Sequence, residues 1–573
     1  MKNKNKKKTS KKKSFYFEDY TESEILVNNS TLKTAKTSLN RVTFLSFIFF
    51  SLIIIFSIKI IYLSLSPEKS FFSKNIKQDH FKKRRDIVDK NGSVLATNVI
   101  LYDVGVRPQL LNEKEKKNLQ INLSLLLPEL DSNKIRKKIN SNEFFWLDKR
   151  LTPKEKDQLW LIGSKAFEFE SRPSRIYPQK NLFSHILGQI DNDNNGISGL
   201  EKSLNENLRS SRDSIKLTVD KDIQFLIRKE LLKYQEIFKS KGSAAILMDV
   251  NNGNILSLVS LPDFNPNERK NISDVNYINR VTKGTYELGS VFKVFTFASA
   301  LNEKLIEPDT EFLDLPKSIK CDRYRIGEYD NEIPSDLTAE QILVRSGNIG
   351  SVRIAQKVGP EKFKSFLEDI GVLTQINFDI EEVAPQIDYD FGKCRLATAS
   401  FGHGVATTIL QLAKGYAILA NGGYDVKPTL VFKEDNKKNN NKRIINKGIS
   451  EQVVNALRKI VNTEEGTARF ADVQNYEIGG KTGTADQPEG GKYSEAKINT
   501  FSSVFPTSNP QFVFVVMLDT PKKSKDYYYK YRHRKGGWKG TLYNTAGWTS
   551  VEVAGKVIDK IGPILATKYI QVY

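Results

Sequence analysis

The sequence predicts an α/β (α+β) protein in which helices cover an antiparallel sheet, preceded by a mixed domain and one N-terminal transmembrane helix. Three observations lead to this prediction. A long apolar run lies near the N-terminus, strand-like segments occur at both ends of the C-terminal part, and helical segments occur between them. Because 573 residues exceed one typical domain, two or three folded units are expected.

The N-terminal region predicts a tail and a membrane anchor. Residues 1–41 carry eleven Lys and Arg against four Asp and Glu, and we expect this segment to be disordered. Residues 42–65 are apolar apart from Lys59 and are long enough to cross about 30 Å of hydrocarbon as a helix. They lack the short core and cleavage site of a signal peptide. The positive-inside rule therefore places residues 1–41 in the cytoplasm and everything after Leu65 outside it.

Composition limits the classes of partner and cofactor. The net charge of +21 is compatible with binding to nucleic acid, with binding to an anionic membrane surface, or with a generally lysine-rich composition. The bias toward Lys, Asn and Ile throughout the chain favours the third explanation. The basic, aromatic segment 527–535 is interpreted as a solvated loop, because a position outside the cytoplasm disfavours nucleic acid. The sequence contains no HExxH or CxxC motif, so no zinc site is predicted. Cys321 and Cys394 are compatible with one disulfide or with two isolated thiols.

Two regions follow the predicted anchor. Residues 66–215 mix strand-like and helical segments, with glycines and prolines that indicate turns. In residues 216–573, apolar runs at 244–249 and 255–260 flank Asn-Asn-Gly and predict an antiparallel hairpin. Further strands are expected near 476–481 and 512–518, with helices between, which gives one sheet covered by helices.

A candidate nucleophile begins the first of these helices. Ser290 is followed three residues later by Lys293, at the start of an apolar run. Residues three apart share a helix face, so the Lys293 amine can approach the Ser290 hydroxyl. Burial and the positive helix end both disfavour an ammonium, so Lys293 is a candidate base. A Ser-x-x-Lys pair alone is common in a lysine-rich chain and is usually a solvated helix face.

Two further motifs support a functional role for the Ser290–Lys293 pair. Ser346-Gly347-Asn348 lies 56 residues after Ser290, and Lys481-Thr482-Gly483-Thr484 lies 135 residues after Ser346. Alone, the first is compatible with a glycine cap and the second with a basic edge strand. Together they supply a shuttling hydroxyl, an orienting amide and a positively charged strand whose glycines let another backbone approach.

These three motifs, in this order, resemble those of the penicillin-recognising serine transferases. Nearly the whole chain after residue 65 is similar to a class B penicillin-binding protein, and most similar to the division-specific, FtsI-like members. The resemblance implies a penicillin-binding transpeptidase fold in residues 216–573, preceded by a pedestal of the dimerisation type in residues 66–215. The further stretches that resemble the family are Phe145-Trp146-Leu147, Arg175-Ile176-Tyr177-Pro178, Phe401-Gly402-His403-Gly404, Asn421-Gly422-Gly423 and Ala546-Gly547-Trp548.

The resemblance also implies a function, that of a serine-type D-Ala-D-Ala transpeptidase. It would crosslink peptidoglycan stem peptides in septal cell-wall synthesis through a serine acyl-enzyme, and β-lactams would inhibit it. The implied catalytic residues are Ser290, Lys293 and Ser346, and the implied substrate-binding residues are Asn348, Lys481, Thr482, Gly483 and Thr484. No metal or cofactor is implied.

The sequence leaves several functional classes open. A β-lactamase or carboxypeptidase would need a positioned base for water, and no Glu-x-x-Leu-Asn pattern lies between Ser346 and Lys481. The motifs are also compatible with an elongation-specific transpeptidase and with a penicillin-binding sensor or scaffold. The implied partners are stem peptides ending in D-Ala-D-Ala, a lipid-linked glycan polymerase and division-site membrane proteins, at a bacterial inner (cytoplasmic) membrane that the chain crosses once.

Overall fold

The computed structural model describes residues 29–65, 84–210, 213–268, 275–322, 324–383, 391–433, 442–489, 492–530 and 536–570. The chain divides into two units, residues 1–79 and 80–573. Residues 1–28 of the predicted disordered tail lie outside the described residues, whereas residues 29–41, which are also expected to be disordered, are helical. Of the basic segment 527–535, residues 531–535 lie outside the described residues. The rest includes the short strand β17 (Tyr528–Lys530), in which Tyr529 is fully buried, so the prediction of a solvated loop is wrong for this part.

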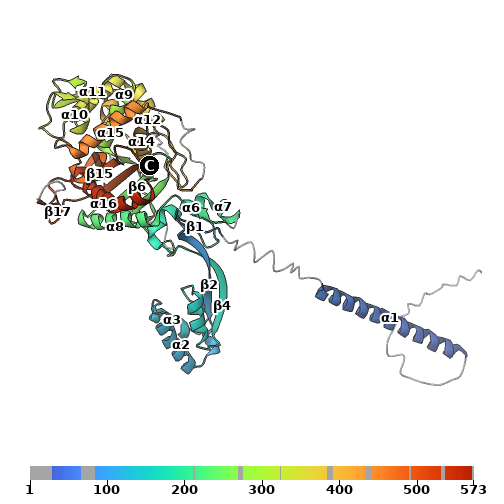
Figure 1. Cartoon of the computed structure of the whole chain (residues 1–573). Coiled ribbons are helices and arrows are strands. Elements are labelled where there is room, and N and C mark those ends of the chain that lie inside the picture. The colour runs from blue at the N-terminus through green and yellow to red at the C-terminus, as the bar shows by residue number, and fades with distance from the viewer. Residues whose placement is uncertain are drawn as a thin grey trace, which may run out of the picture. The chain divides into compact units, whose positions relative to one another are not determined.

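The described residues of the first unit form helix α1 (Asn29–Leu65) (Figure 1). Its stretch Arg41–Tyr62 is long and apolar enough to cross a membrane, judged by length and composition. An apolar helix therefore occupies the segment in which the sequence predicts the anchor.

In the second unit, the pedestal is built on a long two-stranded ribbon (Figure 1). Strand β2 (Val94–Val106) pairs antiparallel with β4 (Phe167–Ile176), and the sheet order is β3-β2-β1-β5 with β4 on β2. At one end of the ribbon, three capped helices pack around their own apolar core and form the head of the pedestal. The three helices of the head are α2 (Glu113–Leu126), α3 (Ser132–Asn140) and α4 (Pro153–Trp160). The other strands of the sheet are β1 (Ile87–Val88), β3 (Phe145–Trp146) and β5 (Ile215–Lys216).

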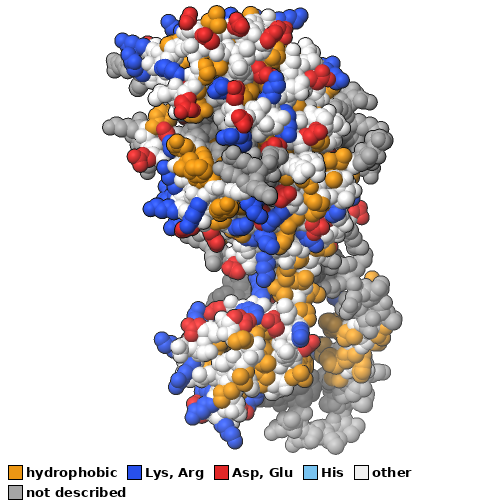
Figure 2. All heavy atoms as spheres, turned by 60° about the vertical axis from the view of Figure 1, so that its left-hand side comes forward, with side chains coloured by type: hydrophobic (Ala, Val, Ile, Leu, Met, Phe, Trp, Pro, Cys, Tyr) orange, Lys and Arg blue, Asp and Glu red, His pale blue; other side chains and the backbone are white. Residues whose placement is uncertain are grey.

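The surface of the head carries several exposed apolar side chains. Figure 2 shows hydrophobic side chains between charged ones over this part of the molecule. Large hydrophobic residues at least 40% exposed here are Leu110, Ile121, Leu125, Trp146, Trp160 and Leu161.

The base of the pedestal shares a hydrophobic core with the C-terminal region. Ile87, Leu95 and Phe183 belong to the same buried cluster as the transpeptidase-like sheet and helices. The base helices are α5 (Ser184–Leu187), α6 (Gly199–Ser203) and α7 (Asn205–Ser210). Packing therefore couples the base tightly to the C-terminal region, whereas the head has a separate core.

A five-stranded antiparallel sheet forms the centre of the C-terminal region, in the order β14-β15-β16-β6-β7. Helices α8 and α16 pack on one face, and α14 and α15 pack on the other. Burial on both faces explains why β6 and β16 are continuous apolar runs. The strands are β6 (Gly242–Asp249), β7 (Ile255–Leu261), β14 (Gly479–Glu489), β15 (Lys492–Phe505) and β16 (Phe512–Asp519).

The helices of this region and its short strands complete the fold. The predicted sheet covered by helices is confirmed, as is the β6–β7 hairpin at Asn-Asn-Gly. The helices are α8 (Lys221–Ile237), α9 (Lys293–Asn302), α10 (Ala339–Val344), α11 (Asn348–Val358), α12 (Pro360–Asp369), α13 (Lys393–Ala399), α14 (Ile409–Ala420), α15 (Lys447–Asn462) and α16 (Ser550–Lys568). The short strands are β8 (Tyr286–Glu287), β9 (Glu311–Phe312), β10 (Ser318–Cys321), β11 (Tyr324–Gly327), β12 (Leu337–Thr338), β13 (Ala406–Thr407) and β18 (Gly537–Lys539).

Two strands differ from the sequence prediction. Strand β14 begins at Gly479 and continues to Glu489, beyond the strand expected near 476–481 and the strand residues expected at 479–484. Strand β15 was not expected at all. Its residues before Ile498 pair only with β14, while residues from Ile498 onward also pair with β16. The outer half is therefore polar and lacks the apolar pattern of a buried strand.

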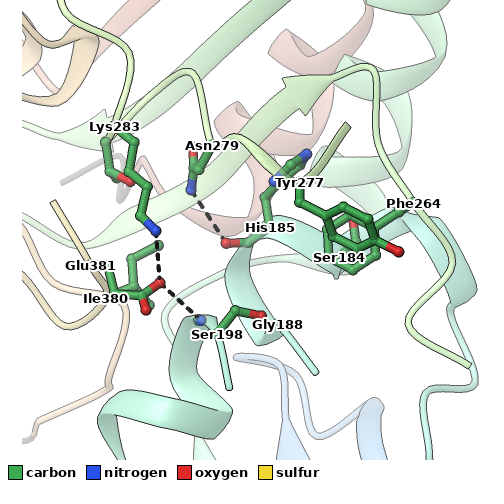
Figure 3. A pocket seen from close by; sticks show the side chains of 12 residues that line it. Ser184, His185, Gly188, Ser198, Phe264, Tyr277, Asn279, Lys283, Ile380 and Glu381 are labelled. Carbon is green, nitrogen blue, oxygen red and sulfur yellow. Dashed lines mark hydrogen bonds and ion pairs between the residues drawn. The ribbon is translucent and has the colours of Figure 1, made fainter. Parts of the chain in front are cut away.

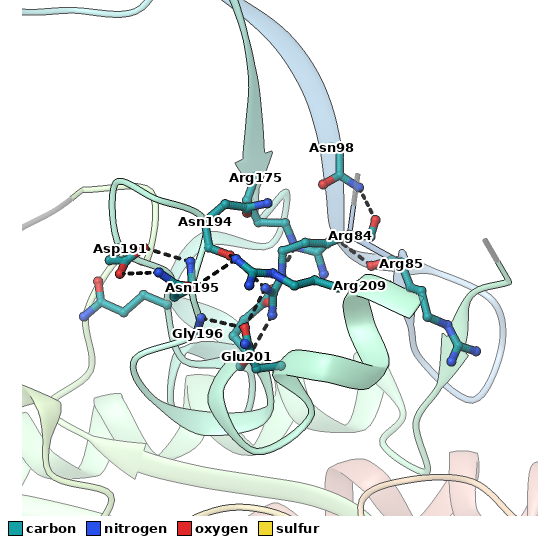
Figure 4. A network of polar contacts seen from close by, with 12 residues as sticks. Arg84, Arg85, Asn98, Arg175, Asp191, Asn194, Asn195, Gly196, Glu201 and Arg209 are labelled. Carbon is teal, nitrogen blue, oxygen red and sulfur yellow. Dashed lines mark hydrogen bonds and ion pairs between the residues drawn. The ribbon is translucent and has the colours of Figure 1, made fainter. Parts of the chain in front are cut away.

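A buried ionic network holds the base of the pedestal together (Figure 4). The Glu201 carboxylate accepts hydrogen bonds from Arg84 Nε at 2.8 Å and from Arg175 Nε at 2.7 Å, and all three side chains are fully buried. Arg84 also donates to the carbonyl oxygens of Asn194 and Glu201, and Arg175 donates to that of Arg85. One carboxylate thus joins the segment before β1 and strand β4 to helix α6.

We predict that Glu201→Ala destabilises the protein by about 3–5 kcal/mol, because it leaves two buried guanidinium groups without their carboxylate. Thermal unfolding of the full-length protein in detergent would measure the change. The matched control is Glu168→Ala, which removes the exposed pair with Arg107 and should cost less than about 1 kcal/mol. Equal unfolding temperatures for the two variants would contradict the prediction.

Candidate active site

The turn that carries Ser290 is fixed by close backbone contacts. Ser290 is half-buried on the 3-10 turn Gly289–Phe292, which leads directly into α9. Gly289 has φ of +61°, and a Cβ there would lie 2.6 Å from the Thr484 carbonyl oxygen. A Cβ on Gly483 would come within 2.1 Å of the Leu288 carbonyl oxygen. Only glycine at these two positions lets strand β14 lie directly against the turn.

Aromatic packing fixes the same turn from its other side. The Tyr416 hydroxyl donates to the Val291 carbonyl oxygen at 2.9 Å, and Phe295 contacts both Phe292 and Tyr416 edge to face. All of these side chains are fully buried. The apolar residues after Ser290 therefore hold the helix that carries Lys293.

Lys293 is buried and surrounded by polar atoms of the second motif. Its Nζ lies 2.5 Å from the Ser346 carbonyl oxygen, 3.2 Å from Ser346 Oγ and 2.7 Å from Asn348 Oδ1. The side chain is 1% exposed. Burial lowers the pKa of Lys293 to about 7, against a smaller opposing effect of the Glu328 carboxylate. Near neutral pH, a substantial fraction of Lys293 is a neutral amine that can accept a proton.

Lys481 approaches the same serine from strand β14. Its Nζ lies 2.8 Å from Ser346 Oγ and 3.3 Å from Thr482 Oγ1. Burial and the neighbouring charge of Lys293 hold the pKa of Lys481 well below its usual value. The Ser346 hydroxyl thus lies between two lysines. Because a hydroxyl has one donor and two acceptor positions, it can donate to a neutral amine on one side and accept from an ammonium on the other.

The other predicted residues surround this group. Ser346 has φ of +61° in the turn between α10 and α11, and Asn348 is the first residue of α11. The Thr482 hydroxyl contacts that of Thr467 at 2.8 Å. Thr484 Oγ1 accepts from the Ala546 backbone at 3.0 Å. The structure therefore brings all eight sequence-predicted residues to three adjoining segments.

Three nearby features were not found from the sequence. Glu328 hydrogen-bonds to the first residues of α11, and Thr467 pairs with Thr482, yet no motif marks either residue. Cys321 and Cys394 form a disulfide with Cα atoms 5.6 Å apart, which joins β10 to α13 and decides a question that the sequence leaves open. Within the part of the chain that is described, there is no cluster of three or more His, Cys, Asp or Glu suited to a metal ion.

A separate cavity lies between the pedestal base and the C-terminal region (Figure 3). Glu381 pairs with Lys283 at 3.3 Å and accepts from the Gly199 backbone at 3.4 Å. His185 and Asn279 line the same space. None of the eight candidate site residues lines this cavity, so it is distinct from the Ser290 site.

The geometry of the Ser290 site defines a class of protein, the penicillin-recognising serine acyltransferases. Two family models match the chain, the penicillin binding protein transpeptidase domain over residues 243–535 and the penicillin-binding protein dimerisation domain over residues 82–236. The chain belongs to the penicillin-binding protein transpeptidase family, and the order of the two domains is that of its class B members.

Curated relatives and a solved structure are similar over most of their lengths. A protein from Caulobacter vibrioides named "Probable peptidoglycan D,D-transpeptidase FtsI" is 28% identical, covering 85% of this chain and 82% of the relative. The stage V sporulation protein D of Bacillus subtilis is 28% identical, covering 80% and 77%. The crystal structure of a peptidoglycan synthetase from Bifidobacterium adolescentis has the same fold, with a TM-score of 0.62 and 21% identity over 85% of this chain and 95% of the other.

The lowered pKa of Lys293 predicts the pH dependence of the site. The rate at which a penicillin acylates the protein should rise with pH and reach half of its maximum near pH 7, because protonated Lys293 cannot act as a base. Acylation rates between about pH 5.5 and 8.5 would measure this. Lys293→Arg keeps a positive charge that cannot be lost and should not be acylated at any of these pH values. A profile that is flat, or that falls with pH, would exclude the neutral amine as base.

Proposed function

We propose that this chain is a peptidoglycan D,D-transpeptidase that crosslinks stem peptides during septal wall synthesis. The observation that carries the proposal is the buried chain of groups Lys293, Ser346 and Lys481 beside the half-buried Ser290. Family membership and the names of the relatives support the same activity.

Acylation is the first half of the reaction. Ser290 Oγ attacks the carbonyl carbon of the penultimate D-Ala, and neutral Lys293 takes the hydroxyl proton. Backbone N–H groups of Ser290 and Thr484 stabilise the resulting oxyanion. The C–N bond then breaks, and the proton returns through Ser346 to the leaving amine. Terminal D-Ala departs and an ester remains on Ser290.

Transfer is the second half. An amine of a neighbouring stem peptide attacks the ester and loses a proton to Lys293, and the new amide is the crosslink. The energy of the cleaved amide is retained in the ester, so no nucleotide is needed. Penicillins acylate Ser290 in the same way because their strained amide occupies the position of the peptide end.

Strand β14 binds the donor peptide. It is an edge strand that pairs only with β15 among the described strands, so an extended peptide can add to its free edge. Gly483 is part of this strand, and Asn348 orients the peptide amide. Thr482 and Thr484 hold the terminal carboxylate through their hydroxyls, and Lys481 supplies the positive field.

The cellular setting is part of the proposal. Residues 1–41 form a cytoplasmic tail, residues 42–65 span the membrane once, residues 66–215 form the pedestal and residues 216–573 form the catalytic domain outside the cytoplasm. The basic residues before the span support this orientation. A lipid-linked glycan polymerase and division-site membrane proteins are the proposed partners.

We predict that a tagged penicillin labels wild-type protein and that Ser290→Ala is not labelled, because the variant has no nucleophile for the acyl group. The full-length protein in detergent would be labelled and followed for hours by gel fluorescence. Label that persists would disfavour a β-lactamase and leave a transpeptidase, a carboxypeptidase and a penicillin-binding sensor, which an assay of peptide crosslinking separates. Rapid loss of the label would favour a β-lactamase, and no label on folded wild-type protein would favour a scaffold.

The septal role makes a separate prediction. Depleting the protein in its own cells should produce filaments, because elongation continues while division stops. Phase microscopy with a fluorescent D-amino acid would show whether wall synthesis at mid-cell is lost. Restoring wild-type protein, but not Ser290→Ala, should restore division. Round cells would instead assign the chain to elongation, and rescue by the Ser290→Ala variant would assign it a scaffold role.

A further inference from the structure

The carboxylate of Glu328 caps helix α11 from a different part of the chain. Its Oε2 accepts from the Asn348 backbone N–H at 2.6 Å, and its Oε1 accepts from that of Ile349 at 2.9 Å. The residue before the helix, Gly347, has no side chain with which to satisfy these groups. Strands β10 and β11 pair antiparallel as a hairpin, and Glu328 follows directly after β11. The end of this hairpin therefore holds the first turn of α11 in place.

The same hairpin end also orients the Asn348 side chain. Asn348 Nδ2 donates to the Gly327 carbonyl oxygen at 2.8 Å, and Asn348 Oδ1 accepts from Lys293 Nζ at 2.7 Å. A carbonyl oxygen is an acceptor, so the NH₂ end of the Asn348 amide must face Gly327, and the amide oxygen therefore faces Lys293. Glu328 fixes the backbone of Asn348, while its neighbour Gly327 fixes the side chain.

Glu328 also contributes charge to the site. Among the charged groups of the described residues, the Glu328 carboxylate is the one that acts on Lys293, and it favours the charged form against the larger effect of burial. Burial, together with the charge of Lys293, lowers the pKa of two neighbouring groups, Lys481 on β14 and His403 after α13.

We propose that Glu328 is a positioning residue for the transfer reaction, which holds Asn348 against Lys293 and supplies the negative charge that acts on this lysine. The inference rests on the proposed function, in which Lys293 is the base. Glu328 touches neither Ser290 nor the peptide in this role and acts through its two neighbours.

The test compares Glu328→Gln with wild-type full-length protein in the rate of acylation by a tagged penicillin as a function of pH. Glutamine keeps the size of the side chain but loses the charge and one of the two acceptors. The maximal rate should fall roughly ten-fold, since small displacements at a catalytic group are costly. The half-maximal pH should also move downward by roughly half a unit or more, because loss of a nearby anion favours the neutral amine.

Two further variants separate positioning from simple stability. Glu328→Asp keeps the charge and should retain the wild-type half-maximal pH. The matched control is Glu332→Gln, which removes an exposed carboxylate from the same loop and should leave both the rate and the profile unchanged.

The outcomes distinguish this inference from the proposed function. A Glu328→Gln protein with the wild-type rate and profile would overturn the positioning role and leave the transpeptidase proposal intact. A lower rate and melting temperature with an unmoved half-maximal pH would reduce Glu328 to a structural cap and would also overturn it. If wild-type protein is not acylated at Ser290, the proposed function fails and the inference fails with it.

Discussion

The site depends on the burial of two lysines around one serine hydroxyl. Lys293 and Lys481 are both at most 1% exposed, and each has its Nζ within 3.2 Å of Ser346 Oγ. Two buried ammonium groups at this separation repel each other and lack the solvation of water, so at neutral pH the group favours a state in which one amine is neutral. The group itself therefore contains a proton acceptor. The arrangement is stable only if the surrounding segments are held rigidly, because either lysine could otherwise reach water.

The fold meets this requirement through contacts between backbones. Gly289 and Gly483 let strand β14 pack against the nucleophile turn, and a Cβ on Gly402 would lie 2.1 Å from the Gly289 carbonyl oxygen. Three segments that are distant in sequence therefore meet without intervening side chains. The sheet fixes strand β14, and the buried helix α9 fixes the turn at Gly289. A further segment, the capped start of α11, carries Ser346 and Asn348. A shift of any one element changes the distances around Ser346.

The sequence predicts much of this and misses specific parts. The apolar helix, the sheet covered by helices and the residues that meet at Ser346 follow from periodicity, turn residues and the order of three motifs. The polar half of β15 escapes prediction because it pairs on one side only and has no buried face to require apolar residues. Glu328 escapes because its partners are backbone N–H groups, which leave no pattern in the sequence. The Cys321–Cys394 pair stays open in the sequence because spacing alone does not determine proximity.

The hydrophobic cluster that stabilises the C-terminal region also surrounds the segment that carries Lys293. Phe292 and Phe295, which lie close to Lys293 in the sequence, and Tyr416, which contacts Phe295, form part of the main hydrophobic cluster. Loosening that cluster would admit water to Lys293 and favour its charged form, so a packing defect would raise the pKa of this lysine. An amine of ordinary pKa near 10.5 is partly neutral near pH 7 because of this burial. The same cluster extends into the base of the pedestal, and the environment of Lys293 is therefore continuous with the packing that joins the two regions.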